Sequence, residues 1–319
     1  MKKSWTSAIN GLLGREDYWH PRVLPRDDPG AGRALYPFDF RSKADYEGPF
    51  DSSGVLLVDF GSRGTVPFAI DIAQFCLALM EKGVNAPLSP WDVAKLNAQL
   101  AFLASAVEQG PGGLIRQRGW TRGDVAWQSA LTQGLVISVF VRSVLLGHTG
   151  NERIDVALRA EEAFYRPLHN GGVVGVGPCG GPFPEETPAA THVLNGGIFA
   201  LWGLEDLQAI RPRDQRRDLI RSILEEMEHA MPSFDCMGGW SLYDLDKRCV
   251  PNAASWFYHN VHIQQLRVLG ARHGDPWWRW HLRWAHAATR TRACAAHSIK
   301  LIHRLMLRSE PVFKLELGH

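Results

Sequence analysis

The chain has 319 residues, of which 45% are hydrophobic and 21% are charged, and its formal net charge is +2. This length suits one large domain, or a main domain with a smaller one. Five cysteines without a CxxC pair argue against a disulfide framework and against a zinc module. The N-terminal sequence lacks the continuous apolar stretch of a signal peptide, so we expect a cytoplasmic protein.

The N-terminal part of the chain, residues 1–65, is predicted to be an irregular arm that contains short strands. It is rich in Pro, Gly and Asp, and its segment Gly54 to Phe60 combines β-prone residues with flanking turn residues. From residue 66 to 319 the pattern is helical, with apolar residues at three- and four-residue spacing. The clearest helices are expected at Ile70 to Met80, Trp91 to Val107 and Trp127 to Leu146. The longest uncharged run, Val125 to Val141, is too short and too polar to cross a membrane.

A weak internal repeat indicates how the helices are arranged. The sequences from Gly150 (GNERIDVALRAEEA) and Gly274 (GDPWWRWHLRWAHAA) each place a Gly-led turn before an amphipathic helix, and each follows an earlier helix. The repeating unit is therefore a helix hairpin. Hairpins that bury one face against their neighbours close readily into a ring. The predicted fold is mainly α: an α/α toroid, or incomplete helical barrel, with a short N-terminal β-containing arm.

A Gly- and Pro-rich segment, Asn170 to Pro188, interrupts the helices and cannot be regular helix. Loops of this length inside helical domains usually carry function. The segment contains GVGPCG, which matches the dinucleotide-binding pattern GxGxxG literally. Pro178 and the prolines after it prevent the helix whose N-terminus would hold a pyrophosphate, so we reject a dinucleotide site.

The C-terminal region is basic. From Arg267 to Arg308 it has nine Lys or Arg and a single acid, Asp275. Such a region attracts polyanions, although a solvated helix surface would have the same composition. No nucleic-acid-binding motif accompanies it. Its four clustered tryptophans are predicted to pack between helices in preference to stacking on sugars: Trp277, Trp278, Trp280 and Trp284.

Four segments, in this order, resemble the D-glucuronyl C5-epimerase family. They are YPFDFRSKADYEGPFDSSGVLLVDFG (Tyr36 to Gly61), WQSALTQGLVISVFVRSVLL (Trp127 to Leu146), EETPAATHVLNGGIFALWGLEDL (Glu185 to Leu207) and SLYDLDKRCVPNAASWFYHNVHIQQLRVL (Ser241 to Leu269). Any one of them arises easily in a helical protein, whereas four in sequence do not. The resemblance implies a helical toroid with its catalytic groups at a groove. It also implies an isomerase that converts D-glucuronate to L-iduronate within a polysaccharide such as heparosan.

Epimerisation at C5 removes a proton beside a carboxylate, so the intermediate carries a second negative charge. The reaction needs a base on one face of the sugar, an acid on the other, and donors or cations around the carboxylate. Tyr258 in SWFYHNVH and Glu186 in PEETP match the family's catalytic Tyr and Glu, and Tyr243 in YDL matches a second active-site Tyr. The chemistry requires no redox cofactor. The expected partner is an anionic, glucuronate-containing polysaccharide, with no nucleic acid and no membrane.

The same segments supply further substrate-binding candidates. They are Asn195 in VLNG, Asn252 in PN, His259, His262, Arg248, Gln133 and Trp127. The asparagines are equally suited to helix capping, Trp127 to the core, and His259 and His262 to positioning Tyr258. The HxxH pair alone is a weak zinc signal without a carboxylate at ligand spacing, so no metal site is predicted. A structural Ca²⁺ ion and a homodimer are left open.

Two departures from the family pattern bear on the substrate. Thr187 follows the catalytic Glu where relatives carry Tyr, and Asp246 stands where an Arg commonly follows YDL. An Arg there would pair with the substrate carboxylate in bidentate fashion, and Arg248 is the candidate substitute. Two other functions stay open. One is a uronate lyase, which starts with the same proton removal, and the other is a catalytically silent polysaccharide-binding relative.

Overall fold

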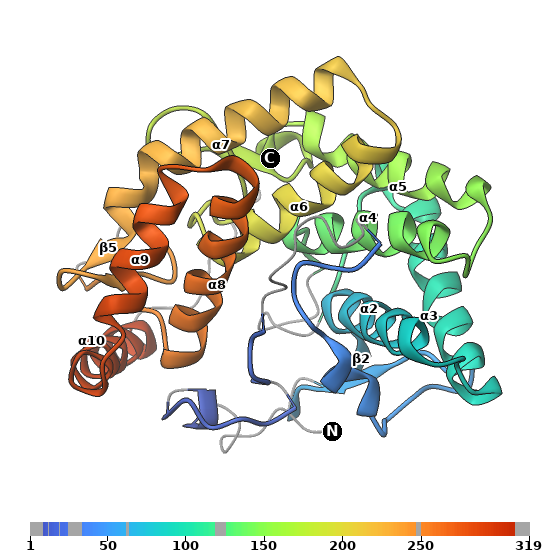
Figure 1. The fold of residues 1–319 in the computed structure, drawn as a ribbon, viewed down its shortest axis with the longest axis horizontal. Helices are drawn as coiled ribbons and strands as arrows, with labels where there is room; N and C mark the ends of the chain where they lie inside the picture. The colour runs from blue at the N-terminus through green and yellow to red at the C-terminus, as the bar shows by residue number, and fades with distance from the viewer. Residues whose placement is uncertain are drawn as a thin grey trace.

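A computed structural model describes residues 9–11, 13–18, 20–24, 34–61, 64–118, 126–246 and 250–309. Helices dominate this part of the chain, which confirms the mainly α class (Figure 1). The α-helices are α2 (Ala69–Asn85), α3 (Pro90–Gln109), α4 (Ala130–Leu145), α5 (Ile154–Glu161), α6 (Leu194–Ile210), α7 (Asp214–Phe234), α8 (Trp256–His273), α9 (Trp277–Ala287) and α10 (Arg290–Ser309). The 3₁₀ helices are η1 (Arg41–Asp45), η3 (Pro111–Gly113), η4 (Asn151–Arg153), η5 (Glu162–Tyr165) and η6 (Leu168–Asn170).

The helices are arranged as successive hairpins. α2, α4, α6 and α8 contact one another in that order, and α3, α5, α7 and α9 each pack against the helix before them. In Figure 1 these pairs follow an open arc, from α2 and α3 on the right, past α6 and α7 at the top, to α8 and α9 on the left. The helix hairpin is thus the repeating unit, and the incomplete toroid stays a prediction.

Two glycines let α4 and α6 meet along their backbones. A Cβ added to Gly134 would lie 2.4 Å from Ala200 Cα, and one added to Gly203 would lie 2.3 Å from the Gly134 carbonyl oxygen. Neither position has room for a side chain. Every residue of α4 from Ala130 to Ser143 is buried, as expected for a helix that carries no charge before Arg142. Among the described residues, neither α4 nor any other helix is long and apolar enough to cross a membrane.

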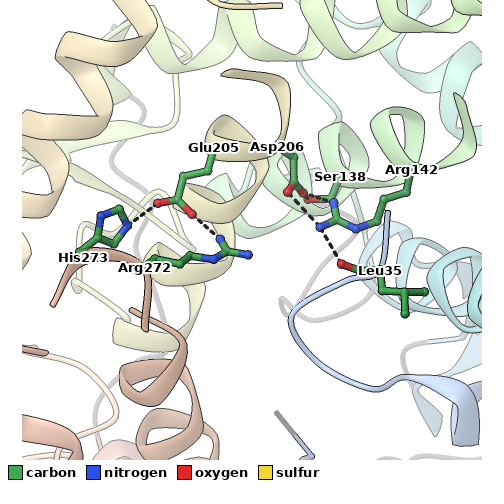
Figure 2. Close-up of polar contacts among 7 residues, drawn as sticks. All are labelled: Leu35, Ser138, Arg142, Glu205, Asp206, Arg272 and His273. Carbon is green, nitrogen blue, oxygen red and sulfur yellow. Dashed lines mark hydrogen bonds and ion pairs between the residues drawn. The ribbon is translucent and has the colours of Figure 1, made fainter. Parts of the chain in front are cut away.

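Ion pairs join α6 to the helices on either side of it (Figure 2). Asp206 pairs with the buried Arg142 of α4. Arg142 also donates to the carbonyl oxygen of Leu35 at 3.3 Å. This bond connects the same junction to the N-terminal segment, by which we mean the described residues that precede α2. The neighbouring acid, Glu205, accepts from Arg272 of α8 at 2.5 Å. Two adjacent acids therefore fix α6 between α4 and α8, and breaking the buried pair would leave a charge without its partner.

The described strands form antiparallel pairs outside the helices. β1 (Leu57–Asp59) pairs with β2 (Thr65–Pro67), β3 (Val174–Val176) with β4 (Pro182–Pro184), and β5 (Asp235–Cys236) with β6 (Trp240–Ser241). β1 confirms the strand expected within Gly54 to Phe60, and β3 and β4 lie in the segment expected to lack regular helix. Tyr36, Phe38 and Leu56 are buried in the same hydrophobic core as the helices. The domain boundary at residue 65 stays a prediction.

Candidate active site

A pinned hairpin positions Glu186. The GVGPCG segment covers the end of β3 and most of the turn before β4, and the Glu226 carboxylate of α7 accepts the backbone N–H groups of Cys179 and Gly181, at 2.8 and 2.7 Å. Directly after β4, the carbonyl oxygen of Glu185 accepts the N–H of Ala130, the first residue of α4, at 2.8 Å. The hairpin is therefore attached to both α4 and α7. The glycines of the GVGPCG segment allow the tight turn. Glu186 is positioned because it directly follows a hairpin that these hydrogen bonds hold in place.

The Glu186 carboxyl group is buried against the first turn of α6. The residue is 2% exposed, and its Oε2 atom has no hydrogen-bond partner among the described residues. A Cβ added to Gly196 would lie 2.5 Å from this oxygen, so the glycine of VLNG leaves the room that the carboxyl group occupies. Burial raises the pKa of the Glu186 carboxyl to about 8, the charge of Asp244 adds to the effect, and hydrogen bonding by Tyr243 opposes it. Glu186 can therefore exchange a proton near neutral pH.

Tyr258 and Tyr243 form an aromatic pair at the start of α8. Their ring centroids are 4.8 Å apart and their planes are inclined at 70°. Tyr258 lies in the first turn of α8, while the backbone of Tyr243 donates to Asn252 at 2.7 Å and accepts from Leu194, at the start of α6, at 3.3 Å. Burial, reinforced by the charge of Glu186, holds the pKa of both phenols above the ordinary value. Both rings therefore keep an O–H that can donate.

One pocket brings three of the predicted residues together. It has a volume of about 130 Å³, and its wall includes Glu186, Asn195 and Tyr258. The Oδ1 atom of Asn195 is buried and has no hydrogen-bond partner in the described part of the chain, so it is free to accept from a ligand hydroxyl. The pocket wall thus combines a carboxyl group that titrates near neutral pH, a phenol donor and an amide. Proton exchange at a carbon acid needs such groups.

Another part of the pocket wall comes from residues outside the three family-like segments that supplied the predicted site residues. Arg22 and Lys43 belong to the N-terminal segment, and Asp71 and Gln74 belong to α2. Lys43 Nζ donates to the carbonyl oxygen of Tyr18 at 2.6 Å. Asp71 and Gln74 are three residues apart, so helical periodicity was a signal that could have found them. Arg22 and Lys43 carry no such local signal, because only long-range folding brings them to α8.

His259 and His262 lie outside the described lining of this pocket. They are 1% and 0% exposed, and the Nδ1 atom of each is hydrogen-bonded to Ser241 Oγ, at 2.9 and 2.8 Å. The His259 ring also stacks on Trp240, with centroids 3.9 Å apart. Burial lowers the pKa of His259 to about 3 and that of His262 well below its ordinary value, so both rings are neutral. These hydrogen bonds join β6 to α8, and the described pocket lining shows no place for the predicted sugar contacts. A role of the two histidines in positioning Tyr258 stays a prediction.

Asn252, Gln133 and Trp127 are also committed to internal contacts. The Asn252 amide donates to Asp244 at 2.7 Å and accepts from Lys300 at 2.8 Å. The buried Gln133 side chain bonds three backbone groups of the surrounding loops and helices, at 2.8 to 3.0 Å. Trp127 is 3% exposed and belongs to the hydrophobic core. These residues organise the walls around the pocket, and the predicted groove contacts are absent from its described lining.

The remaining predictions concern a cation and a metal. Arg248 lies outside the described residues, so its predicted pairing with the substrate carboxylate has no geometry here. Within the described ranges, no group of three or more His, Cys, Asp or Glu side chains could hold a metal ion. Whether the protein binds a structural Ca²⁺ ion therefore stays open, since the described residues include no such group of side chains.

Two comparisons with known proteins point to one family. Residues 117–285 match the family model described as D-glucuronyl C5-epimerase C-terminus, which is just over half of this chain. A D-glucuronyl C5-epimerase of Caenorhabditis elegans is 30% identical over 167 residues, which cover 47% of this chain and 26% of that relative. The match thus spans about a quarter of the relative's length. Glu186, Asn195, Tyr243 and Tyr258 all fall within the range that the family model matches.

Proposed function

The chain belongs to the D-glucuronyl C5-epimerase family, and on that premise we propose that it inverts C5 of D-glucuronate units in a polysaccharide. The observation that carries the proposal is that Glu186, Tyr258 and Asn195 lie in the wall of one pocket. In this proposal Glu186 and Tyr258 act on opposite faces of the sugar ring. The substrate is an anionic polymer that contains glucuronate, with heparosan as the first candidate.

In the first step, Glu186 takes the C5 proton of D-glucuronate. The C5–H bond breaks, the proton moves to the ionised Glu186 carboxylate, and the electron pair delocalises into the sugar carboxylate as an enolate. A pKa of about 8 leaves roughly a tenth of this group ionised at pH 7. The phenol of Tyr258 has a raised pKa and is a much weaker source of base at that pH. We therefore assign proton removal from D-glucuronate to Glu186.

In the second step, Tyr258 delivers a proton to the opposite face of C5. Its O–H bond breaks, a new C5–H bond forms with inverted configuration, and the electron pair stays on the phenolate oxygen. Tyr243, whose ring centroid lies 4.8 Å from that of Tyr258, is placed to stabilise this phenolate by donating its O–H. Exchange with solvent then returns both groups to their starting states. The reverse reaction, from L-iduronate, exchanges the roles of Tyr258 and Glu186.

The enolate also needs positive charge, and the proposal assigns that role to Arg22. The Arg that relatives carry after YDL is replaced here by Asp246. Arg22 reaches the pocket wall from the N-terminal segment, is exposed, and has no ion-pair partner within the described residues. A guanidinium can bind a carboxylate through two parallel hydrogen bonds. Lys43 adds a second positive group to the same wall.

Deuterium incorporation tests the proposal. Heparosan is incubated with the protein in heavy water, and deuterium at C5 is read by NMR. We expect exchange with the wild type and a loss of at least ~100-fold for both Glu186→Gln and Tyr258→Phe, the usual size of general acid–base contributions. The matched controls are Glu228→Gln, at an exposed site on α7, and Tyr165→Phe, whose hydroxyl bonds Glu161 away from the pocket.

The outcomes separate the competing functions. Undiminished exchange in both pocket variants would refute the assignment of the catalytic pair. Release of unsaturated ends that absorb ultraviolet light would identify a lyase, because a lyase expels the C4 oxygen after the same proton removal. Binding of the polymer without exchange by the wild type would identify a catalytically silent relative.

A further inference from the structure

A second pocket adjoins the first one. It has a volume of about 400 Å³ and lies between the N-terminal segment and α8. The walls of the two pockets share Pro21, Arg22, Val23 and Phe257. A polymer with one sugar beside Glu186 therefore has an adjoining space for its next units.

Helix α8 contributes residues to the walls of both pockets. Tyr258 and Val261 lie in the wall of the first pocket, and Asn260, Gln264 and Arg267 lie in the wall of the second. Residues three and four apart share one face of a helix. The second stripe thus runs beside the first for about 10 Å along the helix axis. Groups in both stripes can contact one extended ligand.

The wall of the second pocket suits an anionic sugar. Its charged side chains are Arg15, Arg22 and Arg267 against one acid, Glu16. Arg15 is exposed and forms no ion pair within the described ranges. The Oε1 atom of Gln264 is buried and has no hydrogen-bond partner in that same part of the chain, so it can accept from a sugar hydroxyl. Excess positive charge beside a free acceptor favours a ligand that carries both carboxylate and hydroxyl groups.

Aromatic contacts hold the pocket together. A Cβ added to Gly14 would lie 2.3 Å from Trp256 Cδ1, so the N-terminal segment lies directly against this indole. The ring of His20 meets that of Phe257 edge to face, with centroids 4.9 Å apart. Trp256 and Phe257 are only partly covered, and both belong to the pocket wall. Their apolar faces complete a surface on which a sugar ring can pack.

We propose that this second pocket is a subsite for another uronate unit of the polymer whose glucuronate reacts beside Glu186. The inference rests on the proposed function, because it assumes that a glucuronate polymer occupies the first pocket. Arg15 and Arg267 bind the carboxylate of the second unit, and Gln264 accepts one of its hydroxyls. The enzyme then recognises at least two uronates of one chain and favours substrates long enough to fill both pockets.

Isothermal titration calorimetry with two heparosan oligosaccharides tests the subsite. One is a trisaccharide with a single glucuronate, and the other is a heptasaccharide with three. For the wild type we expect a Kd at least tenfold lower for the heptasaccharide, which exceeds the threefold gain that three equivalent uronates give statistically. Arg15→Met and Gln264→Leu are each expected to reduce this advantage by about 3- to 10-fold. The Arg15 effect should shrink as salt is added.

Arg211→Met, at an exposed position after α6, is the matched control and should keep the full advantage. Equal affinity of the wild type for the two oligosaccharides, or an unchanged advantage in the Arg15→Met/Gln264→Leu double variant, would overturn the subsite. So would a failure of the wild type to bind either oligosaccharide. C5 exchange is measured in parallel. C5 exchange without tighter binding of the heptasaccharide would support the epimerase proposal and refute the subsite. Tighter binding of the heptasaccharide without C5 exchange would support the subsite and refute the epimerase proposal.

Discussion

Replacing Glu186 by Gln is expected to stabilise the fold while it removes the proposed base. Burial raises the pKa of the carboxyl from 4.5 to about 8. Below pH 4.5 the group is protonated in both folded and unfolded chains, so it imposes no penalty there. As pH rises, the unfolded chain ionises first and the folded state loses stability by about 1.4 kcal/mol per pH unit until the folded group also ionises. The full penalty above pH 8 is roughly 4 to 5 kcal/mol.

Glutamine does not ionise, so the variant does not have this pH-dependent penalty. The difference in unfolding free energy between Glu186→Gln and the wild type should therefore be small near pH 4.5 and should grow in favour of the variant up to about pH 8. Urea denaturation followed by circular dichroism at several pH values measures it. Glu228→Gln, at an exposed site, shows what the same change does at the surface. A pH-independent difference for Glu186→Gln, or a wild type that is the more stable at pH 8, would refute the argument.

Two further substitutions test how the site and the fold are held. Gly196→Ala places a methyl group 2.5 Å from Glu186 Oε2 and 2.9 Å from Glu186 Cβ, so C5 exchange should fall about tenfold or more and over-packing should cost about 1 to 3 kcal/mol of stability. Gly197→Ala is its control, since that methyl would meet the flexible end of Met227, and equal exchange in the two variants would contradict the crowding argument. Arg142→Met leaves Asp206 buried without its ion-pair partner and should cost about 3 to 5 kcal/mol in urea denaturation. Arg217→Met, which breaks an exposed pair with Asp214, should cost less than about 1 kcal/mol, and an equal loss in both would show that burial is not the cause.

Apolar periodicity predicted the long helices well, because it is a local property of the chain. The segment Ile70 to Met80 lies inside α2, and Trp91 to Val107 lies inside α3. The helix expected from Trp127 begins three residues later, at Ala130. Trp127 pairs instead with the backbone of Gln117, and the Ser129 hydroxyl caps the first turn of α4. A backbone bridge between two loops leaves no periodic signal in the sequence.

The family motif selected residues that line the first pocket, whereas the sequence does not show which residues are engaged by distant side chains. Resemblance alone selected Glu186 and Tyr258, and the pocket wall contains both. The same motif made His259 and His262 look like ligand contacts. Ser241, which lies 18 and 21 residues earlier in the chain, binds the Nδ1 atom of each ring and keeps them inside the core. These long-range hydrogen bonds depend on tertiary packing, which the spacing of residues along a helix does not predict.

Helix α8 serves both proposed tasks, whereas the exposed arginines that face the two pockets from the N-terminal segment lie outside the matched range. Proton transfer requires a fixed geometry. Glu186 and Tyr258 lie in the matched range 117–285, the first directly after the hairpin that Glu226 holds and the second in the first turn of α8. Long, exposed arginine side chains such as Arg15 and Arg22 can instead adjust to a carboxylate, and both lie outside that range. On these proposals, a change at Arg15 alters which polymer binds, a change at Arg22 weakens stabilisation of the enolate, and proton transfer depends on Glu186 and on Tyr258 of α8.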